Sequence, residues 1–220
     1  MRFFSAIALA VILAGVAGQA DATGSPSARA FSGARSLNDD VLRLALNAAA
    51  CARRAGAVAN ERLLTVIDYS KASTEPRLWV LDLEQERVLF EELVAHGRGS
   101  GENFATAFSN REGSHQTSLG LFRTADTYVG TNGYSLRLDG LEAGVNDRAR
   151  ERAIVMHGAP YVSEANLRTV GRLGRSHGCP ALRPAIARTV IDTIKQGSLV
   201  FAYYPDKQWL QGSRFLNSCS

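Results

Sequence analysis

A glycine-rich stretch with one cysteine constrains this chain more than any other feature. It runs from Gly171 to Leu182, and within it His177 precedes Cys179 by two residues. Gly174 and Gly178 predict backbone angles that other residues avoid, as in a tight turn. A thiol is a good nucleophile only as a thiolate, and a nearby imidazole can accept its proton. The stretch therefore indicates nucleophilic chemistry at Cys179.

A second histidine lies upstream, at the end of a short apolar run. His157 follows Ala153–Met156, which predicts a strand. Strand ends hold side chains rigidly, so His157 is the candidate general base. Other interpretations remain open at this point. His157 could be a core histidine satisfied by the backbone, and Cys179 could be a small buried hydrophobic residue.

These two stretches together resemble the signature of the murein L,D-transpeptidases, the YkuD-type catalytic domain. The resemblance rests on His157, on the Ser176–Cys179 motif, and on the 18 residues between His157 and Ser176. Pro180-Ala181 replaces the apolar residue and Asn that usually follow, as in a divergent branch of the family. The resemblance extends from about residue 63 to 205. It implies a β-rich α+β fold, a β-sandwich-like catalytic domain with an N-terminal helix and a helix following the cysteine loop.

The resemblance also implies site roles. Cys179 is the nucleophile, and His157 is the base, with its other ring nitrogen held by a backbone carbonyl such as that of Gly158. His177 could orient Cys179, contact substrate or shape the turn. From the residues alone, the amides of His177, Gly178 and Cys179 could form an oxyanion hole.

The surroundings of Cys179 leave further roles open. Ser176 could hydrogen-bond within the loop or support a histidine. If Pro180 begins a helix, the helix N-terminus favours the thiolate of Cys179; if the helix begins at Pro184, that argument weakens.

Arginines flank the site. Arg175 is the first candidate for binding a substrate carboxylate, and Arg172 is the second, because guanidinium groups bind carboxylates bidentately. Arg148, Arg150 and Arg152 precede the His157 strand. His96, in a second His-Gly pair, could line the cleft.

Bulk properties exclude several classes. The net charge is +4, too weak and scattered for nucleic acid but compatible with an anionic wall polymer. A zinc hydrolase using His157, His177 and Cys179 is a poor alternative, because no metal-binding motif accompanies them. We therefore predict no metal and no cofactor. A non-catalytic wall-binding module is a further alternative, although such a module needs no nucleophile.

The chain divides into four segments. Residues 1–22 resemble a secretory signal peptide, because Arg2 precedes an apolar run that ends in Ala20-Asp21-Ala22. Residues 23–60 are a flexible lead-in and a docking helix capped by Ser36. Residues 61–206 are the catalytic domain, and residues 207–220 are a C-terminal tail. We expect export to the periplasm or cell wall, with no membrane span in the mature chain.

Hydrophobic periodicity places the elements of the domain. The predicted strands cover residues 63–68, 78–83, 88–95, 119–123, 126–129, 134–138, 153–156 and 199–204, and the predicted helices end at Val170 and cover residues 184–196. Three cysteines in an exported chain leave one odd thiol. The nucleophile must stay free, so Cys51 and Cys219 are the candidate pair; the alternative is a frayed tail with Cys219 free.

The resulting hypothesis is an exported cysteine acyltransferase that acts on peptidoglycan stem peptides through a thioester on Cys179. The same thioester could serve hydrolysis, as in an L,D-carboxypeptidase or in release of a wall-linked lipoprotein. The acceptor and the oligomeric state do not follow from the sequence.

Overall fold

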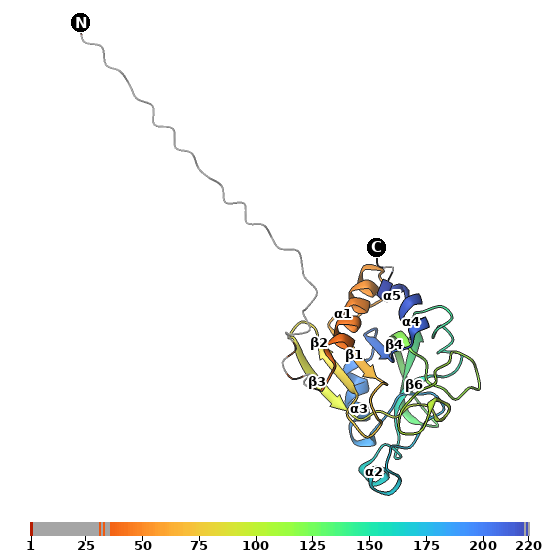
Figure 1. Cartoon of the computed structure of the whole chain (residues 1–220). Coiled ribbons are helices and arrows are strands. Elements are labelled where there is room, and N and C mark those ends of the chain that lie inside the picture. Colours follow the sequence, from red (N-terminus) through yellow and green to blue (C-terminus); the bar gives the residue numbers. More distant parts are fainter. Residues whose placement is uncertain (2–30, 32, 34–35, 218, 220) are drawn as a thin grey trace.

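The computed structural model describes Met1, Phe31, Gly33, residues 36–217 and Cys219, and Figure 1 shows how their elements are arranged. Apart from Met1, the predicted signal segment lies outside these residues. Within the described part of the chain, no helix combines the length and the apolar character needed to cross a bilayer.

The first helix, α1 (Asp39–Arg54), is capped by Asn38. Its side chain accepts hydrogen bonds from the N–H groups of Asp40 and Val41 at 2.8 and 3.3 Å. The predicted cap, Ser36, is wrong by two residues, and its hydroxyl instead contacts Glu91. The predicted apolar face is confirmed, since Val41, Leu42, Ala45, Leu46 and Ala49 are all buried.

Eight strands form one hydrogen-bonded sheet in the order β3-β2-β1-β8-β4-β5-β6-β7. The strands are β1 (Leu63–Asp68), β2 (Leu78–Asp82), β3 (Arg87–Glu92), β4 (Gly120–Gly130), β5 (Gly133–Gly140), β6 (Val155–Gly158), β7 (Ala181–Leu182) and β8 (Leu199–Tyr203). The remaining helices are α2 (Glu164–Val170), α3 (Pro184–Ile194), α4 (Lys207–Gly212) and α5 (Arg214–Asn217), with a 3₁₀ turn at Arg98–Ser100. The predicted β-rich α+β class is confirmed.

Strand β4 differs most from its prediction. Residues 119–123 and 126–129 were expected to be two strands, but they belong to one strand that pairs with β5. The register shifts between Thr124 and Thr127, as at a β-bulge. This irregularity breaks the alternation of apolar and polar residues, which is why the pattern predicted two strands.

The chain beyond β3 joins the two edges of the sheet. Ala95 and Ala181 of β7 exchange backbone hydrogen bonds of 2.9 and 3.4 Å. Gly97 bridges to Ser176, whose N–H donates to the carbonyl of His96 at 3.0 Å. We call this junction, residues 95–98 against residues 176–181, the seam. The seam makes the sheet nearly closed and holds the cysteine loop at its edge.

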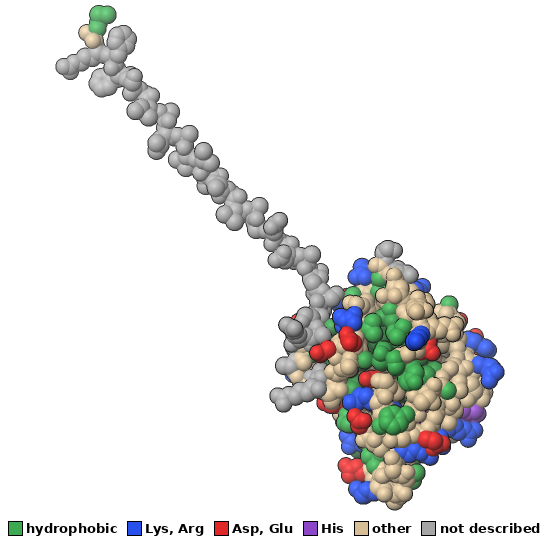
Figure 2. All heavy atoms as spheres, in the orientation of Figure 1, with side chains coloured by type: hydrophobic (Ala, Val, Ile, Leu, Met, Phe, Trp, Pro, Cys, Tyr) green, Lys and Arg blue, Asp and Glu red, His purple; other side chains and the backbone are tan. Residues whose placement is uncertain are grey.

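Both faces of the sheet are covered, so its central strands are apolar on both sides. In β2, Trp79 and Leu81 belong to the core beneath α1, α4 and α5, whereas Leu78 and Val80 belong to the core beneath α3. Figure 1 shows α1, α4 and α5 together on one side and α2 at the opposite end of the molecule. Hydrophobic side chains remain visible between α1 and α4 in Figure 2.

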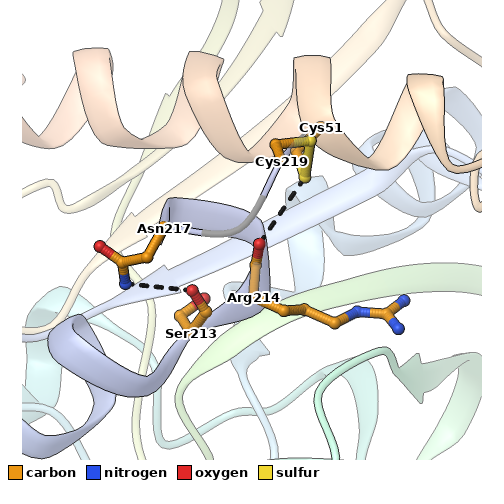
Figure 3. Close-up of a disulfide and its surroundings, with 5 residues drawn as sticks. All are labelled: Cys51, Ser213, Arg214, Asn217 and Cys219. Carbon is orange, nitrogen blue, oxygen red and sulfur yellow. Dashed lines mark hydrogen bonds between the residues drawn. A yellow bond between two sulfur atoms is a disulfide. The ribbon is translucent and has the colours of Figure 1, made fainter.

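A disulfide ties the two ends of the described chain together (Figure 3). Cys51 of α1 and Cys219 are bonded across a sequence separation of 168 residues, which confirms the predicted pair. The Cys51 sulfur lies 3.8 Å from the carbonyl oxygen of Arg214, and the Asn217 side chain donates to the carbonyl of Ser213 at 3.1 Å. The segment predicted as a tail thus carries α4 and α5 and packs on α1.

Removing the Cys51–Cys219 bridge should destabilise the protein. Cys51→Ala with Cys219→Ala should lower the free energy of unfolding by about 4–5 kcal/mol in the chain-entropy model, because the closed loop is long. Denaturant unfolding measures the change, with Cys179→Ala as the control that leaves the bridge intact. Thiol counting under non-reducing denaturation should find one free thiol per wild-type chain; three would contradict the bridge.

Candidate active site

Cys179 lies immediately before β7, against the backbone of β6. Its Sγ accepts a hydrogen bond from the Val155 N–H at 3.5 Å and donates to the Ala153 carbonyl at 3.6 Å. The residue is 8% exposed, and it is the free cysteine of the described chain. In this resting arrangement the thiol is a protonated donor to a backbone carbonyl.

His157 lies in β6 and pairs with Ala181 of β7, two residues beyond Cys179. Its Nδ1 is 3.1 Å from the Gly158 carbonyl, which can only accept, so Nδ1 carries the proton and Nε2 is left as an acceptor. The predicted location at a strand end and the carbonyl partner are both found. Among the hydrogen bonds of the described residues, none joins the Cys179 thiol to His157. Catalytic hydrogen bonds often tighten only when substrate binds.

The resting charges of the two groups follow from burial. Burial raises the pKa of the Cys179 thiol, and this effect is opposed by the Val155 N–H and the charge of Arg152. Burial also lowers the pKa of His157, opposed by the Gly158 carbonyl. The pair therefore rests as a neutral thiol and a neutral imidazole, and a neutral imidazole is the form that can accept a proton.

Hydrogen bonds within the cysteine loop fix the backbone at Cys179. The Ser176 hydroxyl donates to the Cys179 carbonyl at 2.6 Å and accepts from the Gly178 N–H at 3.0 Å. Thr117 adds a second tie, since its hydroxyl donates to the Gly178 carbonyl at 3.2 Å and accepts from the Gly97 N–H at 2.9 Å. Ser176 thus supports the loop, as one of the two predicted alternatives had it.

The predicted oxyanion hole is corrected at one position. The Gly178 N–H is committed to Ser176 and is not available to a substrate oxygen. Among the hydrogen bonds of the described residues, the N–H groups of His177 and Cys179 have no acceptor. Those two amides remain the candidates for stabilising a developing oxyanion.

The helix after the cysteine loop begins too far along the chain for its N-terminus to favour the Cys179 thiolate. Pro180 leads into β7, and α3 begins at Pro184 with Arg183 as its N-cap residue. Of the two predicted helix starts, the one at Pro184 is confirmed and the one at Pro180 is wrong, because residues 181–182 pair with β6 instead. The helix N-terminus therefore does not adjoin Cys179.

A cavity of about 310 Å³ reaches Ala153, the residue whose carbonyl contacts the thiol, although neither Cys179 nor His157 is among its lining residues. It is lined by Glu112, Gly113, His115, Glu151, Arg152, Ala153 and His177. His177 is exposed. Its ring packs edge-on against the ring of His115, with the two ring centroids 4.4 Å apart. The histidine atoms visible in Figure 2 lie beside Lys and Arg side chains. A larger cavity of about 420 Å³ near Trp209 includes no residue of the cysteine loop in its lining.

Comparison with known proteins decides the family. Residues 33–203 match the L,D-transpeptidase catalytic domain. This chain belongs to that family. No curated protein matches it.

Several solved structures are similar to this L,D-transpeptidase domain at low identity. An L,D-transpeptidase from Mycobacterium smegmatis is 16% identical, with a TM-score of 0.40 over 65% of this chain and 59% of that one. L,D-transpeptidase 1 from Mycobacterium tuberculosis is 16% identical, with a TM-score of 0.36 over 65% and 62%. The helical cell shape determining protein Pgp2 from Campylobacter jejuni is 14% identical, with a TM-score of 0.45 over 66% and 48%. The match thus spans about half to three fifths of these longer chains.

His96 of this L,D-transpeptidase domain does not line the cleft. It is fully buried, with Nδ1 2.8 Å from a guanidinium nitrogen of Arg77 and Nε2 3.4 Å from the Gly101 carbonyl. Burial, helped by the Arg77 charge, lowers the pKa of His96 to about 4. Arg77 also donates to the Val94 carbonyl at 2.8 and 3.0 Å. The pair therefore supports the seam from within, and burial removes the basis for a direct substrate contact.

The two arginines predicted to bind a substrate carboxylate are bound to a carboxylate of the protein itself. Arg175 lies 2.7 Å and Arg172 lies 2.9 Å from the oxygens of Glu102. Arg175 also donates to the Gly101 carbonyl at 2.9 Å. Neither arginine lines the cavity that reaches Ala153. Substrate binding at these residues would require Glu102 to move away.

Sequence reasoning did not single out Arg152 as a residue of the site. It was one of three arginines before the His157 strand, and nothing in the spacing separates it from Arg148 and Arg150. The structure does separate it, because Arg152 lines the cavity whereas Arg148 and Arg150 form exposed ion pairs with Glu151 and Asp139.

Gly178→Ala should destabilise the domain and distort the loop. Gly178 has φ +123°, and an added Cβ would lie 2.8 Å from the Gln116 carbonyl oxygen and 2.9 Å from Ile154. We expect a loss of about 1–3 kcal/mol in the free energy of unfolding relative to a control, because backbone atoms cannot give way cheaply. Gly113→Ala is the control, since Gly113 also has positive φ but no neighbour within 4 Å. Equal losses for the two variants would show that packing at Gly178 is not the cause.

Proposed function

We propose that this chain is an exported L,D-transpeptidase that acts on peptidoglycan stem peptides through a thioester on Cys179. The observation that carries the proposal is the site itself. A free cysteine sits in a fixed loop, its thiol contacts the carbonyl of Ala153 in the wall of a cavity, and a histidine with an accepting nitrogen lies on the adjacent strand. Membership of the L,D-transpeptidase catalytic domain family supports it.

The acylation step follows from the roles of these groups. His157 Nε2 accepts the thiol proton, and the sulfur attacks the carbonyl carbon of the third stem residue, forming a C–S bond. The C–N bond to the terminal D-amino acid then breaks, and the leaving amine takes the proton from His157. The amides of Cys179 and His177 would stabilise the intermediate oxyanion. Dividing the exchange into acylation and deacylation replaces one hard step with two easier ones.

Deacylation decides the net reaction. An amine of a second stem gives a cross-link, whereas water gives L,D-carboxypeptidase activity or releases a wall-linked lipoprotein. The thioester is common to all of these outcomes, so the cavity must admit either an amine or water. Export is supported by the Cys51–Cys219 bridge, because disulfides persist in oxidising compartments.

Product analysis tests the proposed activity. Purified sacculi are incubated with the mature protein, and the muropeptides are separated and weighed by mass spectrometry. We expect tetrapeptide stems to be consumed and cross-linked products to appear, with no turnover by Cys179→Ala. Tripeptide stems without cross-links would identify the hydrolytic alternative. Binding to sacculi without turnover by a folded wild-type protein would favour a wall-binding module.

The two histidines should differ in importance. His157→Ala should slow acylation by about a hundredfold or more, the usual loss for a general base. His177→Ala should have a milder effect, because His177 is exposed and makes its ring contact with His115 rather than with the thiol. Single-turnover acylation rates measure both variants, with circular dichroism as the folding check. The opposite ranking would reverse the assigned roles.

A further inference from the structure

Arg152 is a partly buried cation whose partners are neutral. Its guanidinium donates to the carbonyls of Ser109 and Gln116, both at 2.7 Å, and to the hydroxyls of Ser118 at 2.5 Å and Ser114 at 3.3 Å. Among the ion pairs of the described residues, none involves Arg152. Its charge is therefore well hydrogen-bonded but has no counter-ion in the resting protein.

The neighbouring arginines show how unusual this is for the segment. Arg148 pairs with Glu151 at 3.2 Å, and Arg150 pairs with Asp139 at 2.6 Å. The Arg148–Glu151 pair is exposed and the Arg150–Asp139 pair is partly exposed, so water also screens both pairs. A cation taken partly out of water without an opposite charge is costly unless an anion forms nearby.

The site of such an anion is adjacent. Arg152 precedes Ala153, whose carbonyl accepts the hydrogen bond from the Cys179 thiol, and both residues line the cavity of about 310 Å³. Ala153 has φ +52°, a left-handed conformation that a non-glycine residue seldom adopts. This turn directs the backbone between Arg152 and β6 towards Cys179.

We propose that Arg152 is a positioning residue that supplies the counter-charge for the Cys179 thiolate, while its hydrogen bonds hold residues 109–118 as a wall of the substrate cavity. This inference rests on the proposed nucleophilic role of Cys179. When the thiol proton passes to His157, the Arg152 charge gains its missing anion. The Arg152 side chain therefore has two roles. It holds the wall that meets the substrate, and it supplies the charge that favours the Cys179 thiolate.

Other titratable groups also face this region. The groups near the thiol or in the cavity are Tyr69, Tyr161, His157, His115, His177, Glu112 and Glu151. The tyrosine pKa values of Tyr69 and Tyr161 are raised, chiefly by burial, so both rings stay neutral below pH 9. Burial lowers the pKa of His157 and of His115, which favours their neutral forms, and the carboxylates of Glu112 and Glu151 in the cavity lining would oppose a thiolate. Arg152 is thus the cation in the cavity lining that remains charged at alkaline pH.

The alkylation rate of Cys179 as a function of pH tests the inference without any stem peptide. The other two cysteines are bridged, so iodoacetamide reports on Cys179 alone. Arg152→Gln should shift the profile towards higher pH, so that alkylation near pH 8 is roughly tenfold slower, which corresponds to about one pKa unit. Arg152→Lys keeps the charge and should recover most of the rate. Arg150→Gln is the matched control and should leave the profile unchanged.

Two results with these variants would contradict the inference. If Arg152→Gln folds, as judged by near-ultraviolet circular dichroism, and its profile superimposes on that of the wild type, the inference is wrong. If all three arginine variants shift the profile alike, the effect is one of net charge, and the inference is also wrong.

A measurement on the wild type covers the case in which the variants fail to fold. At pH 9, a cation beside the thiol should speed reaction with anionic iodoacetate relative to neutral iodoacetamide. Compared with a free thiol, that rate ratio should be higher at low salt and should fall as salt is added. A ratio equal to that of a free thiol would overturn the inference. Neither assay depends on transpeptidation, so a protein that fails on sacculi but shows the Arg152 effect would contradict only the proposed function.

Discussion

The seam between the two edges of the sheet is the constraint on which the site depends. Backbone hydrogen bonds link Ala95 to Ala181 and His96 to Ser176, so the chain after β3 and the cysteine loop hold each other in place. The approach is close, because a Cβ on Gly97 would lie 2.8 Å from the Gly178 Cα. Only glycine permits this contact, and the Thr117 hydroxyl bonds to both sides of it, to the Gly97 N–H and the Gly178 carbonyl.

Burial and charge act in opposite directions on the pKa of the Cys179 thiol, the proposed nucleophile. The protein withdraws Cys179 from water, which raises the pKa of its thiol, and then surrounds it with the Val155 N–H and the Arg152 cation. His157, also buried, rests as a neutral base. A thiol that stays protonated until substrate arrives is less exposed to oxidation, which matters in a compartment where the Cys51–Cys219 bridge forms.

The sequence predicted several strands and the position of the cysteine loop well, because both depend on local patterns. Apolar runs marked β1, β2 and β8 almost to the residue, and the Ser176–Cys179 motif identified the loop. Long-range geometry was not accessible in this way. Whether Arg172 and Arg175 meet a substrate or Glu102 depends on where residue 102 returns in space, and whether His96 is buried depends on Arg77 in the preceding strand connection. The two-residue strand β7 has no periodicity of its own, since its partner β6 defines it.

The most direct test of the central claim is the mass of the intact protein after brief incubation with a tetrapeptide-stem muropeptide and acid quenching. Acid preserves a thioester because it protonates the nucleophiles that would otherwise attack it. The account predicts an adduct equal to the stem without its terminal residue, mapped by peptide analysis to Cys179 and absent from Cys179→Ala. A folded wild-type protein that turns the muropeptide over while its mass stays unmodified, or an adduct that persists in Cys179→Ala, would contradict it.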